Sequence, residues 1–174
     1  MRLSEWRSGA PNREALGPRV TAVLEPVLGA LGAGPDPELW VVWGEDPGTR
    51  YTMLLPITAG LGVVNVRVSV PGEGPRASGR LVRWSRLQFG ELDVEAQAGH
   101  LLASIQVEGL VLRGVDAAAG QMAAFVRTVM AGADGRPLPG ASRGKRAPAP
   151  ALGSRRARDS DSAGPGSSGA RRSR

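Results

Sequence analysis

The amino-acid sequence predicts an α+β fold, in which an antiparallel sheet of about five strands is flanked by helices. Two observations predict this class. Apolar residues recur at helical spacing near the N-terminus and again shortly before Gly132. Between these two stretches, apolar and polar residues alternate as they do in half-buried strands. The expected order of elements is α-β-β-β-α-β-β-α.

The first helix is predicted from about Arg13 to Leu31. Its apolar residues fall at i, i+3, i+4, i+7, i+8 and i+11, and they are Val20, Val23, Leu24, Val27, Leu28 and Leu31. Pro26 removes one backbone donor inside this stretch, so we expect a kink or a second helix start there. Gly32 and the Gly34-Pro35 pair then end the helix.

Three antiparallel strands are predicted next, at 39–43, 51–55 and 63–70. These segments are rich in β-branched and aromatic residues, and the first two are separated by the Gly- and Pro-containing segment 44–48. The third strand alternates most clearly. Val64, Val66, Val68 and Val70 share one face, and Asn65, Arg67 and Ser69 share the other. The pattern predicts a sheet with one buried side.

The segment from Arg80 to Phe89 has two interpretations. As a strand it would place Leu81, Leu87 and Phe89 on one face and divide the arginines between the two faces. As a helix it would gather Arg80, Arg83 and Arg86 on one basic face, because residues three apart are neighbours on a helix. We favour a short helix.

A hairpin and a last helix complete the predicted domain. Residues 91–97 and 101–107 alternate between apolar and polar side chains on either side of Ala98-Gly99, which predicts two strands joined by a short turn. Asp116 is expected to cap the N-terminus of a helix that closes near Gly132. The apolar stripe of this helix contains Met122, Phe125, Val126 and Val129.

Charge divides the chain into a domain, residues 1–136, and a tail, residues 137–174. The domain has a formal net charge of −1 and the tail one of +7. Pro, Gly, Ser, Ala and Arg make up most of the tail, and Leu138 and Leu152 are its only large apolar residues. Such a composition buries too little surface to offset the entropy of ordering, so the tail is predicted to be disordered.

The element order resembles that of the type III secretion chaperone-like fold, and in particular the small bacterial domains of the YbjN type. The resemblance covers roughly residues 13–132 and is most marked at Leu81-Val-Arg-Trp-Ser-Arg-Leu-Gln-Phe-Gly-Glu-Leu-Asp-Val-Glu. This stretch looks like the short helix of that family running into a Gly-initiated strand. The resemblance implies a homodimer that binds extended segments of other proteins, and it implies no shared catalytic residues.

No group of residues in the sequence predicts catalysis, a metal site or a cofactor. The chain contains no cysteine, which excludes disulfides and thiolate chemistry and is compatible with the cytoplasm. His100 is the only histidine, and the acidic residues near it, Glu91, Asp93 and Glu95, alternate along one strand face as solvated residues do. No apolar run is long enough to predict a membrane span.

The sequence therefore predicts a non-enzymatic protein-binding module that is chaperone-like or adaptor-like, cytoplasmic and homodimeric. Trp40 and Trp43 are an odd number of residues apart, so they face opposite sides of a sheet, and one of them is expected to leave the core. With Trp84 they are the candidate protein-binding residues. Arg80, Arg83 and Arg86 form a candidate basic face. The alternative function is nucleic-acid binding through the basic tail. A third hypothesis is an enzyme that uses His100 together with its acidic neighbours.

Overall fold

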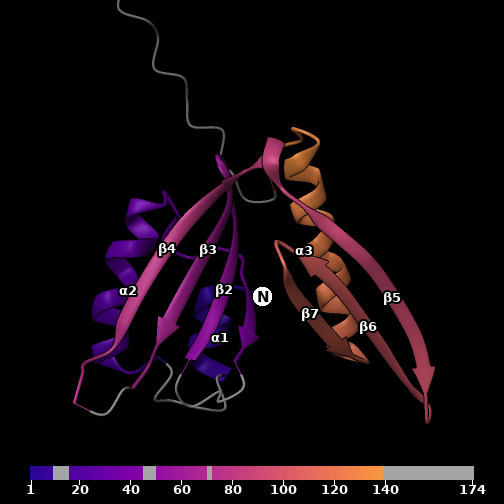
Figure 1. Ribbon diagram of the computed structural model, residues 1–174, viewed down its shortest axis with the longest axis horizontal. Helices are drawn as coiled ribbons and strands as arrows, with labels where there is room; N and C mark the ends of the chain where they lie inside the picture. Colours follow the sequence, from indigo (N-terminus) through magenta and orange to yellow (C-terminus); the bar gives the residue numbers. More distant parts are fainter. Residues whose placement is uncertain (10–15, 45–49, 70–71, 139–174) are drawn as a thin grey trace, which may run out of the picture. The chain divides into compact units, whose positions relative to one another are not determined.

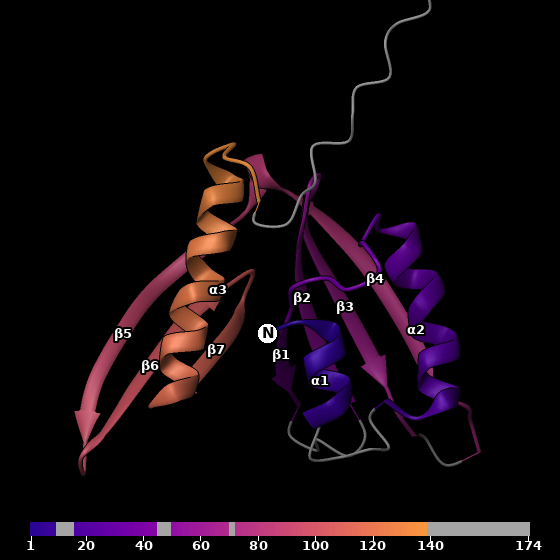
Figure 2. The same ribbon diagram turned by 180° about the vertical axis from the view of Figure 1, so that it is seen from behind.

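The computed structural model describes residues 1–9, 16–44, 50–69 and 72–138. Contacts divide the chain into two units, Met1–Ser142 and Arg143–Arg174, of which the second lies wholly outside the described residues. In the first unit, the described residues form three α-helices and seven strands in two antiparallel sheets (Figures 1 and 2). The α+β class is confirmed. The predicted disorder of the tail concerns residues that, apart from Pro137 and Leu138, lie outside the described part.

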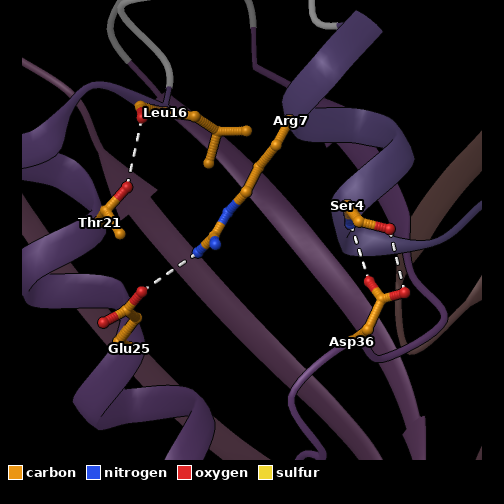
Figure 3. A network of polar contacts seen from close by, with 6 residues as sticks. All are labelled: Ser4, Arg7, Leu16, Thr21, Glu25 and Asp36. Atoms are coloured by element: carbon orange, nitrogen blue, oxygen red, sulfur yellow. Dashed lines mark hydrogen bonds and ion pairs between the residues drawn. The ribbon is translucent and has the colours of Figure 1, made fainter.

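The first helix, α1 (Leu3–Gly9), was not expected from the sequence. It is held to the segment before the first strand by Asp36, whose carboxylate accepts hydrogen bonds from the Ser4 backbone N–H (2.8 Å) and the Ser4 hydroxyl (3.0 Å) (Figure 3). These bonds, the backbone one first, lower the pKa of Asp36. Arg7 reaches Glu25 of the next helix at 3.4 Å. A helix of only seven residues is not stable in water by itself, so these contacts explain why α1 forms.

The second helix, α2 (Pro18–Ala30), carries the predicted apolar stripe and buries Val20, Leu24 and Leu28. The predicted start near Arg13 lies outside the described residues. Pro26 does not begin a second helix, because α2 runs through it unbroken. Ala22, four residues earlier, is exposed. Pro26 has no N–H to donate, so the Ala22 carbonyl lacks its bond within the helix. Because Ala22 is exposed, water can replace the missing donor, which lowers the cost of the proline.

The first sheet contains four strands in the order β1 (Trp40–Trp43), β2 (Arg50–Ile57), β3 (Gly60–Arg67) and β4 (Arg76–Arg83). Its first three strands are those predicted, although β3 ends at Arg67, before Val68. The predicted single buried side is wrong. Val64 and Val66 belong to one core with α1 and α2, whereas Val63 belongs to a second core with the last helix.

The predicted short helix over 80–89 is also wrong. β4 pairs with β3 in register from Arg76 to Arg83, a single 3₁₀ turn, η2 (Trp84–Arg86), follows, and β5 begins at Phe89. Leu81 packs with the first core and Val82 with the second. Because the two neighbouring apolar residues of this mostly exposed strand turn to different cores, its sequence shows no period-2 alternation, and the helical spacing of its arginines carries no structural meaning.

The second sheet has the order β5 (Phe89–Gln97), β6 (His100–Val107) and β7 (Leu110–Val115). The predicted hairpin is confirmed, and both turn residues, Ala98 (φ 52°) and Gly99 (φ 86°), have the positive φ of a two-residue turn. β7 was not predicted. The two cores are therefore built around two sheets where the sequence predicted one sheet of about five strands.

The last helix, α3 (Ala117–Ala133), buries the predicted stripe of Met122, Phe125, Val126 and Val129. Asp116 stands at the N-cap position, but its side chain makes no capping bond. Its carboxylate turns to β6, where it accepts a bond from the Leu101 backbone N–H at 2.9 Å. The predicted cap is therefore wrong in its bonding and right in its position.

Candidate functional site

An apolar groove lies between β5 and α3, and its existence follows from the widths of the elements. α3 packs on β7 and β6. A helix with its side chains is about 10 Å wide and neighbouring strands are about 4.8 Å apart, so one helix covers about two strands. The third strand, β5, keeps part of its apolar face open, and Figure 1 shows it at the outer edge of this sheet.

The groove encloses about 330 Å³ and is lined almost entirely by apolar side chains. β5 contributes Leu92 and Val94, and α3 contributes Met122 and Met130, with Arg127 as the charged residue of the lining. Leu92 is 58% exposed and Val94 is 60% exposed. Contiguous apolar surface of this kind is unfavourable in water and marks binding surfaces.

β5 is also an edge strand, and its shape is set by a bulge. The register with β6 shifts between Phe89 and Leu92, so that Phe89 shares the apolar face with Leu92 despite their odd separation. Gly90 is required in the bulge, because a Cβ there would stand 2.7 Å from Cβ of Gln106. Among the described residues, β5 pairs only with β6, so its outer backbone groups are open to a further strand.

The opposite face of β5 is acidic. Glu91, Asp93 and Glu95 alternate with the groove residues and are exposed, as the sequence predicted for a solvated face. Asp93 and Glu95 line a shallow hollow on this outer face, together with Arg113 of β7. A strand added beside β5 would therefore meet apolar side chains on one face and carboxylates on the other.

His100 is bonded to Asp116 and not to these acids. Its Nδ1 lies 2.8 Å from Oδ2 of Asp116, and this bond, followed by that from Leu101, lowers the pKa of Asp116. The pair joins the start of β6 to the start of α3. No group of three or more His, Cys, Asp or Glu side chains suited to a metal ion occurs among the described residues. The arrangement holds the hairpin in place, and nothing in it provides a nucleophile beside a base.

The structure does not bring the three candidate tryptophans together. Trp40 is buried in the second core, 6.0 Å from Phe125 between ring centroids. Trp43 packs on the other side of the sheet against Trp6 and Tyr51 and is 36% exposed, which confirms the predicted division of the two faces. Trp84 donates its indole N–H to the Thr58 carbonyl at 3.2 Å. Their role in protein binding stays a prediction.

The candidate basic face of Arg80, Arg83 and Arg86 does not form. Arg80 and Arg83 belong to β4, where residues three apart point to opposite faces, and Arg86 lies in the turn after it. Arg80 pairs with Glu108 of the β6–β7 turn at 3.6 Å. The sequence also did not reveal the groove. Leu92 and Val94 were expected on a strand, but their exposure follows from the width of a three-stranded sheet under one helix.

No protein-family model, curated protein or solved structure matches the chain. In the part of the chain that the structure describes, no helix is both long and apolar enough to cross a membrane.

Proposed function

We propose that the protein is a non-enzymatic protein-binding module, chaperone-like or adaptor-like, which receives an extended segment of a partner protein at β5. The observation that carries this proposal is the open apolar groove beside the outer edge of β5, with which no other described strand pairs. Burying exposed Leu or Val side chains stabilises a complex by roughly 1 to 2 kcal/mol each. Main-chain pairing along nine residues of β5 adds direction and register.

The chemistry of the partner segment follows from the two faces of β5. Side chains of an added strand alternate in the same way, so apolar residues of the partner would enter the groove. Its other residues would lie opposite Glu91, Asp93 and Glu95, and opposite charges across neighbouring strands are stabilising. The partner segment therefore alternates apolar with basic residues. Pairing of β5 with β5 of a second copy would set carboxylates against carboxylates and is disfavoured.

The remaining parts of the proposal concern assembly and location. We propose that the protein is a homodimer that uses an apolar face other than the β5 edge. The outer face of the second sheet offers one, since Val111 and Val115 are large apolar residues exposed there. We place the module in the cytoplasm, with which a cysteine-free chain is compatible. The resemblance to YbjN-type domains, which implies the same kind of binding, stays a prediction.

A nine-residue peptide of alternating Val and Lys, labelled for fluorescence anisotropy, tests the proposal. The wild-type protein should bind it, and peptides that replace Lys by Glu or Val by Ser should bind at least about tenfold more weakly. Methylating alternate backbone nitrogens should abolish binding in one frame and spare the other, because only one edge of an added strand faces β5.

The matched variants are Val94→Asp in the groove and Val115→Asp on the outer face. Both place a carboxylate on an exposed valine of the same sheet. Val115→Asp is expected to change the assembly, but the groove lies within one protomer, so only Val94→Asp should prevent binding of the Val-Lys peptide. Equal binding of the Val-Lys peptide by both variants would overturn the proposal, because the peptide would then not bind in the groove. A Ser-Lys peptide that binds as well as Val-Lys would also overturn it, because the affinity would then be only electrostatic.

A further inference from the structure

Three arginines that are far apart in the sequence stand in one row across the first sheet. Arg50 of β2 lies directly opposite Arg67 of β3, and Arg67 lies directly opposite Arg76 of β4. Residues that face each other across antiparallel strands point their side chains to the same face, with Cβ atoms about 5 Å apart. The three guanidinium groups therefore extend from one face of the sheet, and all three residues are exposed.

Within the described residues, this row is unfavourable without a ligand. Like charges directly opposite each other destabilise a strand pair, and the row contains two such pairs. Within the described ranges, Arg50, Arg67 and Arg76 take part in none of the ion pairs, whereas Arg80, on the same face, is paired with Glu108. An anionic ligand would convert this repulsion into binding energy.

The surroundings of the row suit a small ligand. A hollow of about 350 Å³ contains Arg50 and Arg67, with Val42 and Leu110 as apolar wall and no Asp or Glu in its described lining. This volume lies within the range of small-molecule sites, about 300 to 1,000 Å³. The Thr52 hydroxyl donates to the Asn65 side-chain oxygen at 2.9 Å, and this bond does not use the Asn65 amide N–H groups, which could donate to a ligand.

We propose that the row binds the phosphate monoester or pyrophosphate group of a small molecule. Such a group has a charge near −2 and three acceptor oxygens on its terminal phosphorus, so the guanidiniums of two neighbouring arginines in the row can share it. A carboxylate or a nucleic-acid diester carries one charge and two free oxygens and satisfies a single guanidinium. Val42 and Leu110 would contact the organic part of the molecule. The site is independent of the β5 groove and does not rest on the function proposed for it.

Titration of the full chain with inorganic pyrophosphate tests this site. The central variant is Arg67→Gln, and the matched control is Arg83→Gln, an exposed arginine of β4 outside the row. Both remove one charge and leave the basic tail intact, so binding by the tail cancels in the comparison. Arg67→Gln should weaken pyrophosphate binding at least about tenfold, the loss typical of a charge-assisted contact. Arg83→Gln should leave the affinity within about twofold.

Thermal unfolding separates this effect from loss of the fold. Without ligand, Arg67→Gln should melt no lower than wild type, because the substitution relieves two repulsions. At the same concentration, pyrophosphate should raise the melting temperature of wild type and of Arg83→Gln by similar amounts and that of Arg67→Gln by less. If Arg67→Gln fails to fold, Arg76→Gln at the end of the row replaces it, with the same expected loss.

Two other anionic ligands test which class of anion the row binds. A ten-residue oligothymidylate that carries only diester phosphates should bind through the row more weakly than pyrophosphate. If the oligonucleotide bound more tightly than pyrophosphate, and Arg67→Gln lost this binding, the proposal would be overturned in favour of a nucleic acid. A glutamate decapeptide that depends equally on Arg67 would overturn it in favour of an acidic protein segment. Equal pyrophosphate affinity of the two arginine variants would remove the site altogether.

Discussion

The indole of Trp84 occupies the space that a side chain at Gly132 would need. A Cβ at Gly132 would stand 2.6 Å from Cζ2 of Trp84, closer than non-bonded carbon atoms approach. Trp84 lies in the turn between the two sheets, and its indole N–H is bonded to the Thr58 carbonyl. The contact therefore joins the end of α3 to the connection between the sheets.

Gly132→Ala should lower the free energy of unfolding by about 1 to 3 kcal/mol, because the indole can move away only by losing its bond to Thr58. Urea denaturation provides the measurement. Gly120 of the same helix is the control, since a Cβ there meets nothing within 4 Å and Gly120→Ala should stabilise the protein by up to about 1 kcal/mol. If Gly120→Ala lowered the free energy of unfolding as much as Gly132→Ala does, the proposed clash with Trp84 would not be the cause.

Asp116→Asn should destabilise the protein at neutral pH and have less effect in acid. The bonds from His100 and Leu101 lower the pKa of Asp116 in the folded state below its usual 3.8. A carboxyl with a lowered pKa contributes stability above its unfolded pKa, and this contribution is lost as the pH falls through the folded pKa. The difference in stability between the two proteins should therefore shrink as the pH falls below about 3.8 toward pH 2. A constant difference would show that Asp116 acts through packing alone.

We expect light scattering at tens of micromolar to give the mass of a dimer. Apolar side chains remain exposed on both faces of the second sheet, and closed two-fold dimers are the commonest way to cover such surfaces. Val115→Asp should shift the protein toward the monomer, whereas Val94→Asp in the groove should not. A wild-type monomer at this concentration would contradict the dimer.

The sequence predicted those elements whose local pattern and tertiary surroundings agree. The stripe of α3 was correctly assigned because its apolar residues face a single core. The opposite orientation of Trp40 and Trp43 followed from their spacing alone. β4 was assigned wrongly because Leu81 and Val82 enter different cores, so its pattern does not alternate, and the regular spacing of its arginines imitated a helix.

The candidate sites could not be predicted from local patterns. The exposure of Leu92 and Val94 depends on which strands α3 covers. The row of Arg50, Arg67 and Arg76 depends on the register of three strands, which juxtaposes residues that no short-range period connects. β7 was missed because Arg113 and Gly114 interrupt a short apolar run. Both sites thus arise from strand pairing and helix placement, which a single sequence does not specify.

The last prediction separates the proposed module from the alternative, nucleic-acid binding through the basic tail. If the tail binds duplex DNA, each phosphate that it neutralises contributes about −0.9 to the slope of log affinity against log salt, so four or five contacts give a slope near −4. Truncation after Arg136 would then abolish DNA binding.

We expect the truncated protein to melt within about a degree of the full chain, since the tail has little to bury. It should also keep its affinity for the Val-Lys peptide, with a shallower salt dependence, because apolar burial and main-chain pairing are screened far less than exposed charges. Loss of peptide binding on truncation, together with steep DNA binding by the full chain, would favour the nucleic-acid function.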